Sequence, residues 1–185
     1  MSKPPSRSTM SRKSTAYHEA GHAVITRVLT LGAGRASIRP DYREGHAGYS
    51  ITFDPYRCLH EWEKRGHVRD YPDAVWHARI MSMMAGAEAE AELLGLTPLG
   101  DDYDRREIER MAEELTPGNW HKLEPRLRAM TRMLVRRHRA RIERLAKALL
   151  AQTTLSAKQV VDALVGRSVD DIKVNAPFLL AMHRS

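Results

Sequence analysis

The sequence has almost no cysteine and no long apolar stretch. Cys58 is the single cysteine among 185 residues, so an intrachain disulfide framework and a Cys-rich metal cluster are both excluded. No window approaches the roughly 20 apolar residues that a membrane-spanning helix needs. The basic, polar residues 1–13 also lack the apolar segment of a signal peptide. We therefore expect a cytoplasmic protein with no transmembrane segment.

The content of acidic and aromatic residues is also low. Asp and Glu total 23 against 30 Lys and Arg, which gives a formal net charge of +7, and aromatics make up 6%. A positive charge of this size suits an acidic partner such as nucleic acid. Nine of the bases lie between Arg126 and Lys147, with Glu143 as the one acid among them. Their spacing is typical of the solvated face of a helix, and few aromatics accompany them for base stacking. Nucleic acid is therefore not the expected partner, and nucleic-acid binding remains the alternative function.

The apolar residues recur mostly at helical spacing. A chain that is 42% hydrophobic at this length can bury one core. We expect a mainly α fold with a small β-hairpin close to the first helix. Residues 1–13 are expected to form a disordered basic tail, 14–168 the domain, and 169–185 a C-terminal tail to which the pattern assigns no structure. The predicted helices are 14–31, 59–64, 73–94, 102–116, 125–152 and 157–165, and the hairpin lies within 36–53.

The first predicted helix carries a metal-binding pattern. His18 and His22 are four residues apart, so both imidazoles project from one face and can reach one ion. Glu19 stands beside them, where a carboxylate can take a proton from water activated by the metal. This H-E-x-x-H spacing is typical of zinc peptidases. Gly21 lies within the same helix at a cost of about 1 kcal/mol relative to alanine, so we expect another backbone to approach closely there.

A catalytic zinc site needs a third protein ligand from outside this helix. Asp104 shares a helical face with Ile108 and Met111, which directs its carboxylate inward, whereas Asp102 shares a face with Arg106. Helix capping is the other explanation for an Asp in a first turn. The sequence offers these candidates for the third ligand: His46, Glu88, Glu90, Glu92, Asp101, Asp102 and Asp104.

Glu90 is unusual because it falls on the apolar stripe of the second long helix, together with Met83, Ala87 and Leu94. A buried carboxylate requires a partner. One role is to accept the N–H of a ligating histidine and so fix its orientation, behind the metal ligands themselves. An ion pair with one of the many arginines fits the spacing equally well.

Several segments of the sequence form a wider pattern. They are Y-H-E-A-G-H-A-V at 17–24, S-I-R-P at 37–40, G-Y-S at 48–50, A-G-A-E-A-E-A-E-L-L-G at 85–95, G-D-D-Y-D at 100–104 and the run from Arg136 to Ser156. In their order and approximate spacing, these segments resemble the peptidase domain of the FtsH-type ATP-dependent zinc proteases. The resemblance covers about residues 14–165.

The resemblance implies a function and a set of site residues. The family's third zinc ligand, an Asp that ends a Gly-x-x-x-Asp turn, falls on Asp104. Its Gly-Gly-Arg-x-Ala-Glu segment aligns with residues 85–90 and favours Glu90 as the functional acid, although Ala87 stands where the family has Arg. The expected function is a zinc-dependent metalloendopeptidase with Glu19 as general base and His18, His22 and Asp104 as metal ligands. A non-catalytic adaptor of the same fold is a further alternative.

The sequence departs from the family in having no G-x-x-x-x-G-K-[ST] nucleotide-binding motif. We therefore expect no ATPase activity from these residues. The expected substrates are unfolded or small polypeptides, and folded substrates would require a separate ATPase or unfoldase as partner. The resemblance also allows a homo-oligomer.

Overall fold

The computed structural model describes residues 11–40, 47–52, 55–66, 73–97 and 102–165. They form a mainly helical fold with one small antiparallel sheet, which confirms the predicted fold class. No helix within these ranges is long and apolar enough to cross a membrane. The helices are α1 Arg12–Val28, α2 Pro55–Lys64, α3 Asp73–Leu94, α4 Asp102–Leu115, α5 Trp120–Arg137, α6 Arg139–Gln152 and α7 Ala157–Val165.

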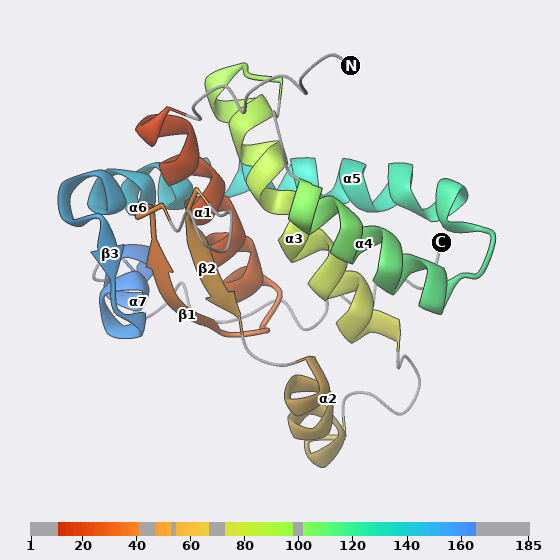
Figure 1. Ribbon diagram of the computed structural model, residues 1–185. Helices are drawn as coiled ribbons and strands as arrows, with labels where there is room; N and C mark the ends of the chain where they lie inside the picture. The colour runs from red at the N-terminus through yellow and green to blue at the C-terminus, as the bar shows by residue number, and fades with distance from the viewer. Residues whose placement is uncertain (1–10, 41–46, 53–54, 67–72, 98–101, 166–185) are drawn as a thin grey trace.

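Helix α1 lies at the centre of the fold. It packs against α3 and α6 and contacts strands β1 (Ala33–Ser37) and β2 (Tyr49–Thr52), so that helices and sheet surround it (Figure 1). Ala16, Ala20 and Ala23 are each 0% exposed. Small side chains at these positions let neighbouring elements approach the α1 backbone on several sides. The helix that carries H-E-x-x-H is therefore buried within the core.

Gly21 marks a very close contact between α1 and α3. A β-carbon at this position would lie 2.5 Å from the carbonyl oxygen of Ala85 and 2.8 Å from Cβ of Ala89. No side chain fits in this space, which confirms the expected backbone approach. The contact brings the middle of α3 directly against the turn that contains His18 and His22.

The ends of α1 differ from the prediction. The helix begins at Arg12, because the Ser11 side chain accepts a hydrogen bond from the Ser14 backbone N–H at 3.1 Å and thereby caps it. It ends at Val28, where Leu31 N–H bonds to Thr26 O and Thr30 adopts a left-handed φ of 65°. This ending usually uses glycine, so the threonine hid it from the sequence pattern. Arg12 and Lys13 are thus helical, and residues 1–10 of the predicted tail lie outside the described ranges.

The single helix predicted over 125–152 is wrong, because it is two helices that meet at His138. Helical hydrogen bonding continues on both sides: His138 N–H bonds to Leu134 O, and Ile142 N–H bonds to His138 O. The two halves have different neighbours, however, since α5 packs against α3 and α6 against α1. One continuous apolar stripe thus covers both partners, and helical periodicity alone does not reveal the interruption.

The sheet has the strand order β2-β1-β3. Strands β1 and β2 form the predicted hairpin, with Ser37 opposite Tyr49. The third strand, β3 (Thr154–Leu155), pairs with β1 and was not predicted, because two residues are too short for a recognisable alternation. Strand β2 lies at one edge of the sheet, because it comes first in the strand order, and it contacts α1. Helix α2 begins at Pro55, earlier than expected. The C-terminal segment 166–185 lies outside the described ranges.

Candidate metal centre

Two helices bring three potential metal ligands together. His18 and His22 project from α1, and Asp104 comes from the first turn of α4. Their nitrogen and oxygen atoms all lie within 4.8 Å of one another. Asp104 Oδ2 is 2.9 Å from His22 Nε2 and 3.4 Å from His18 Nε2. The structure thus places Asp104 beside both histidines, while the candidates His46 and Asp101 lie outside the described residues.

The other ring nitrogen of each histidine is held by α3. His22 Nδ1 is 2.8 Å from the carbonyl oxygen of Ser82, which can only accept, so Nδ1 carries the proton. His18 Nδ1 lies 2.6 Å from a carboxylate oxygen of Glu90 and donates to it in the same way. These contacts fix both rings with Nε2 directed toward Asp104.

This arrangement requires a positive charge at its centre. A neutral imidazole that is protonated at Nδ1 presents a lone pair at Nε2, and the Asp104 carboxylate also presents only lone pairs. Three acceptors in one buried place repel each other unless a proton or a cation lies between them. Imidazole nitrogen and carboxylate oxygen are ligands that zinc accepts, and they bind it in these deprotonated forms. The residues present therefore fit a divalent metal ion.

The ionisation of the cluster points the same way. Burial disfavours the charged form of His22, but the Asp104 carboxylate outweighs this effect and raises the pKa of His22. Burial likewise works against the charged form of Asp104, yet the imidazoles of His22 and His18 hold its pKa well below the usual range. Asp104 is accordingly an anion that faces the two rings.

Glu19 lies beside this cluster and is 5% exposed. Burial raises the pKa of its carboxyl group, and the imidazoles of His18 and His22 oppose that rise only in part. A carboxyl group with a raised pKa is suited to accept a proton and return it. Gly48, just before β2, comes so near that a β-carbon there would lie 2.8 Å from Glu19 Oε1. The carboxylate thus sits between the histidines and the edge of the sheet.

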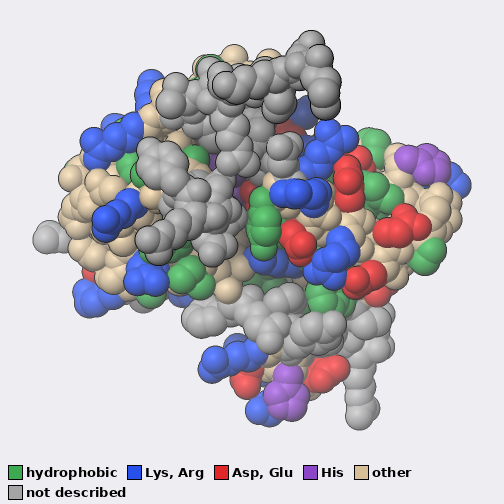
Figure 2. Space-filling view, in the orientation of Figure 1, with side chains coloured by type: hydrophobic (Ala, Val, Ile, Leu, Met, Phe, Trp, Pro, Cys, Tyr) green, Lys and Arg blue, Asp and Glu red, His purple; other side chains and the backbone are tan. Residues whose placement is uncertain are grey.

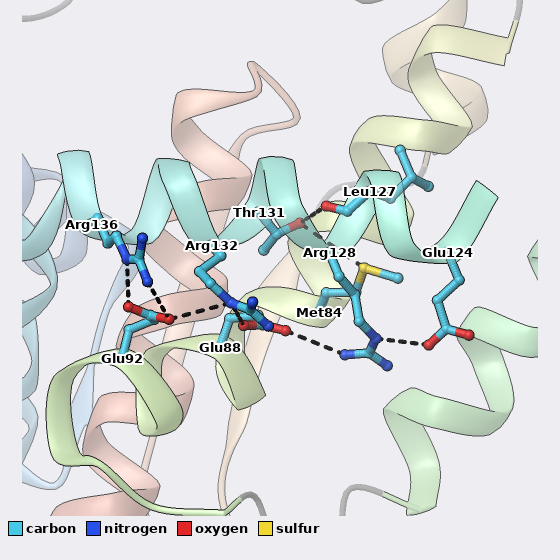
Figure 3. Close-up of polar contacts among 9 residues, drawn as sticks. All are labelled: Met84, Glu88, Glu92, Glu124, Leu127, Arg128, Thr131, Arg132 and Arg136. Carbon is cyan, nitrogen blue, oxygen red and sulfur yellow. Dashed lines mark hydrogen bonds and ion pairs between the residues drawn. The ribbon is translucent and has the colours of Figure 1, made fainter. Parts of the chain in front are cut away.

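The three glutamates of α3 have different partners. Glu90 contacts His18, as described above. Glu88 pairs with Arg132 at 3.0 Å and with Arg128 at 3.5 Å, on the side of α3 that faces α5 (Figure 3). Glu92 accepts from Arg136 at 2.6 Å on the same side. The ion pair with arginine that fitted Glu90 by spacing is therefore formed by its neighbours.

Two contributors to the site were missed from the sequence. One is the Ser82 carbonyl, which no side-chain pattern can identify. The other is Gly86, where a β-carbon would lie 2.5 Å from His22 Nε2 and 2.6 Å from His18 Nε2. A glycine in the middle of an alanine-rich helix is the same signal that drew attention to Gly21, and it could have been read at Gly86 too.

Comparisons with known proteins do not extend this description. A scan against protein-family models finds no match for the chain. A search of curated proteins finds no significant relative either. The resemblance to FtsH-type peptidases rests on the sequence motifs alone and remains a prediction.

Proposed function

We propose that the protein is a zinc-dependent endopeptidase that cleaves unfolded or small polypeptides. The observation that carries the proposal is the convergence of His18 Nε2, His22 Nε2 and Asp104 Oδ2 beside the buried carboxylate of Glu19. Two imidazoles and one carboxylate leave part of a metal's coordination open, as a catalytic zinc site requires.

Zinc is the favoured ion, although the donor set alone does not select it. Two histidines and one carboxylate also occur in non-haem iron(II) oxygenases. Glu19 distinguishes these possibilities, because a buried carboxylate next to the ligands serves hydrolysis. When bound, the metal supplies a Lewis acid that acidifies water and polarises the carbonyl oxygen of a substrate.

Each residue of the proposed site then has a definite role. Glu19 accepts a proton from the attacking water and delivers it to the leaving amine. Its raised pKa makes that return step easier. Glu90 and the Ser82 carbonyl keep both imidazoles in the tautomer whose Nε2 presents the lone pair that a metal needs. Asp104 adds the negative charge that a divalent cation needs.

The resemblance to FtsH-type peptidases supports peptide bonds as the substrate class. Because the 185 residues contain no nucleotide-binding loop, we assign to them the cleavage of chains that are already unfolded. A separate ATPase or unfoldase is the proposed partner for folded substrates. Assembly into a homo-oligomer and a cytoplasmic location are parts of the same proposal.

The rival function, nucleic-acid binding, is less well supported by the basic residues of α5 and α6. Arg128, Arg132, Arg136 and Arg139 each pair with a carboxylate. Figure 2 shows acidic and basic side chains next to one another over α4, in the right-hand part of the view. Phosphate-driven binding would weaken steeply with added salt, so a titration with DNA or RNA at several salt concentrations tests this rival directly.

The substitution Glu19→Gln tests the proposal. The amide is close in size to the carboxylate but cannot act as a base, so we expect zinc content and fold to be retained. Cleavage of an unfolded casein-type substrate without ATP should fall by about 10²- to 10⁴-fold or more. Glu143→Gln, which alters a surface pair with Arg139, is the matched control and should cleave normally. A Glu19→Gln protein that binds zinc and cleaves at the wild-type rate would refute the proposal, and so would wild-type cleavage that survives complete removal of metal.

A further inference from the structure

Helix α3 contacts the two histidines through three positions that are four residues apart. Ser82 binds the His22 ring through its carbonyl oxygen at 2.8 Å, and Glu90 binds the His18 ring at 2.6 Å. Gly86 lies between them, one turn from each. Positions with this spacing share one face of a helix. The face therefore holds the rings at its two ends and has no side chain in the middle.

Gly86, where this face has no side chain, lies next to Nε2 of His18 and Nε2 of His22. A β-carbon on Gly86 would lie 2.5 Å from His22 Nε2, 2.6 Å from His18 Nε2 and 2.7 Å from His18 Cδ2. These separations are far shorter than ordinary van der Waals contacts. A zinc ion bound to the same nitrogens would need to lie about 2.0 to 2.1 Å from each. A methyl group and an ion would thus compete for the same side of the rings.

The neighbouring structure leaves little freedom to relieve this conflict. Both rings are tied at Nδ1 to α3 itself, so they cannot turn away without losing those hydrogen bonds. The two helices are also locked together at Gly21, where α3 approaches the α1 backbone closely. Any movement that makes room at Gly86 disturbs one of these contacts.

We propose that Gly86 is a positioning residue of the metal centre, because the absence of its side chain keeps the space in which the histidines bind the ion. The inference rests on the proposed metal site. It is independent of whether the bound metal cleaves peptides, since it concerns binding alone.

The substitution Gly86→Ala tests this inference by zinc binding. We expect zinc affinity, measured by competition with a chromophoric chelator, to fall at least 100-fold. The rise in melting temperature that zinc produces in the wild type should disappear. Far-UV circular dichroism should still report a helical protein, because alanine favours a helix more than glycine does. Ala91→Ser, which adds one atom to half-buried Ala91 of the same helix, is the control and should bind zinc normally.

A second background separates a steric conflict at the rings from a general folding defect. In His18→Ala/His22→Ala, both rings are absent, so adding Gly86→Ala should raise the melting temperature instead of lowering it. If Gly86→Ala folds only in that background, the conflict with the rings is supported. Failure to fold in both backgrounds, or wild-type zinc affinity of the single variant, would overturn the inference. A wild type that binds zinc without cleaving peptides would instead overturn the proposed function and leave this inference standing.

Discussion

The two sides of α3 carry acids that are equally buried and yet do different things. Glu90 is 3% exposed and Glu88 is 4% exposed. Glu90 faces α1 and meets the imidazole of His18. Glu88 instead faces α5 and meets the guanidinium groups of Arg128 and Arg132, as Figure 3 shows. Burial alone therefore does not tell which acid belongs to the proposed metal site, and the assignment of Glu90 to that site rests on its partner, His18.

The side that faces α5 is built as a repeating set of ion pairs. Glu88 and Glu92 are one turn apart, as are Arg128, Arg132 and Arg136, and Arg132 lies within reach of both acids. Each charge has a partner of opposite sign, which balances the helix pair without external ions. On the side that faces α1, Glu90 contacts His18, whose Nε2 lies beside Asp104. The proposed metal centre lies on this side.

The largest effect that separates the two sides is expected for Glu90→Gln. The amide keeps the shape of the side chain but loses the charge that orients and strengthens the His18 ligand. Loss of such an outer partner commonly costs about 10- to 100-fold in metal affinity. We expect a zinc titration to show this loss with little change in the free energy of unfolding without metal. Unchanged zinc affinity would mean that Glu90 is merely a structural acid.

Glu88→Gln should lower the free energy of unfolding and leave zinc affinity unchanged. Removing the acid leaves two arginines whose side chains are 33% and 44% exposed, so water compensates them in part. The cost lies between that of a surface pair and that of a buried pair, and we expect a loss of about 1 to 2 kcal/mol in urea unfolding. Zinc affinity should match the wild type. A variant with normal stability and weakened zinc binding would invert the assignment of the two acids.

The smallest effect is expected for Glu92→Gln, and it should depend on pH. The hydrogen bond from Arg136 lowers the pKa of Glu92. A lowered folded-state pKa stabilises the protein above the unfolded value of about 4.3, and this contribution is lost as pH falls through the folded-state pKa. The stability difference between wild type and variant should therefore be measurable at neutral pH and shrink in acid. A difference that grew on acidification would contradict the ion-pair description.

Much of the site could be predicted from local spacing. His18 and His22 share a face because they are four residues apart, and Asp104 was directed inward by its register with Ile108 and Met111, both of which are buried. The register works because one face of α4 must cover the core. The same logic found Glu90 but could not name its partner, since His18 lies 72 residues away in the sequence.

The features that could not be predicted depend on contacts between distant segments. The helix is interrupted at His138, between the half that covers α3 and the half that covers α1, and a continuous apolar stripe does not record this change of partner. Strand β3 exists only through its pairing with β1. The Ser82 carbonyl belongs to the backbone, so its role is independent of the side chain at that position.

In the proposed metal centre, His18, His22 and Asp104 together hold one zinc ion. Anomalous diffraction from crystals of the purified protein, collected on both sides of the zinc absorption edge, would locate this ion. We expect a single strong peak per chain, within bonding distance of His18 Nε2, His22 Nε2 and an oxygen of Asp104. A zinc-supplemented crystal with no peak at these atoms, or with its peak bound by other residues, would contradict the account.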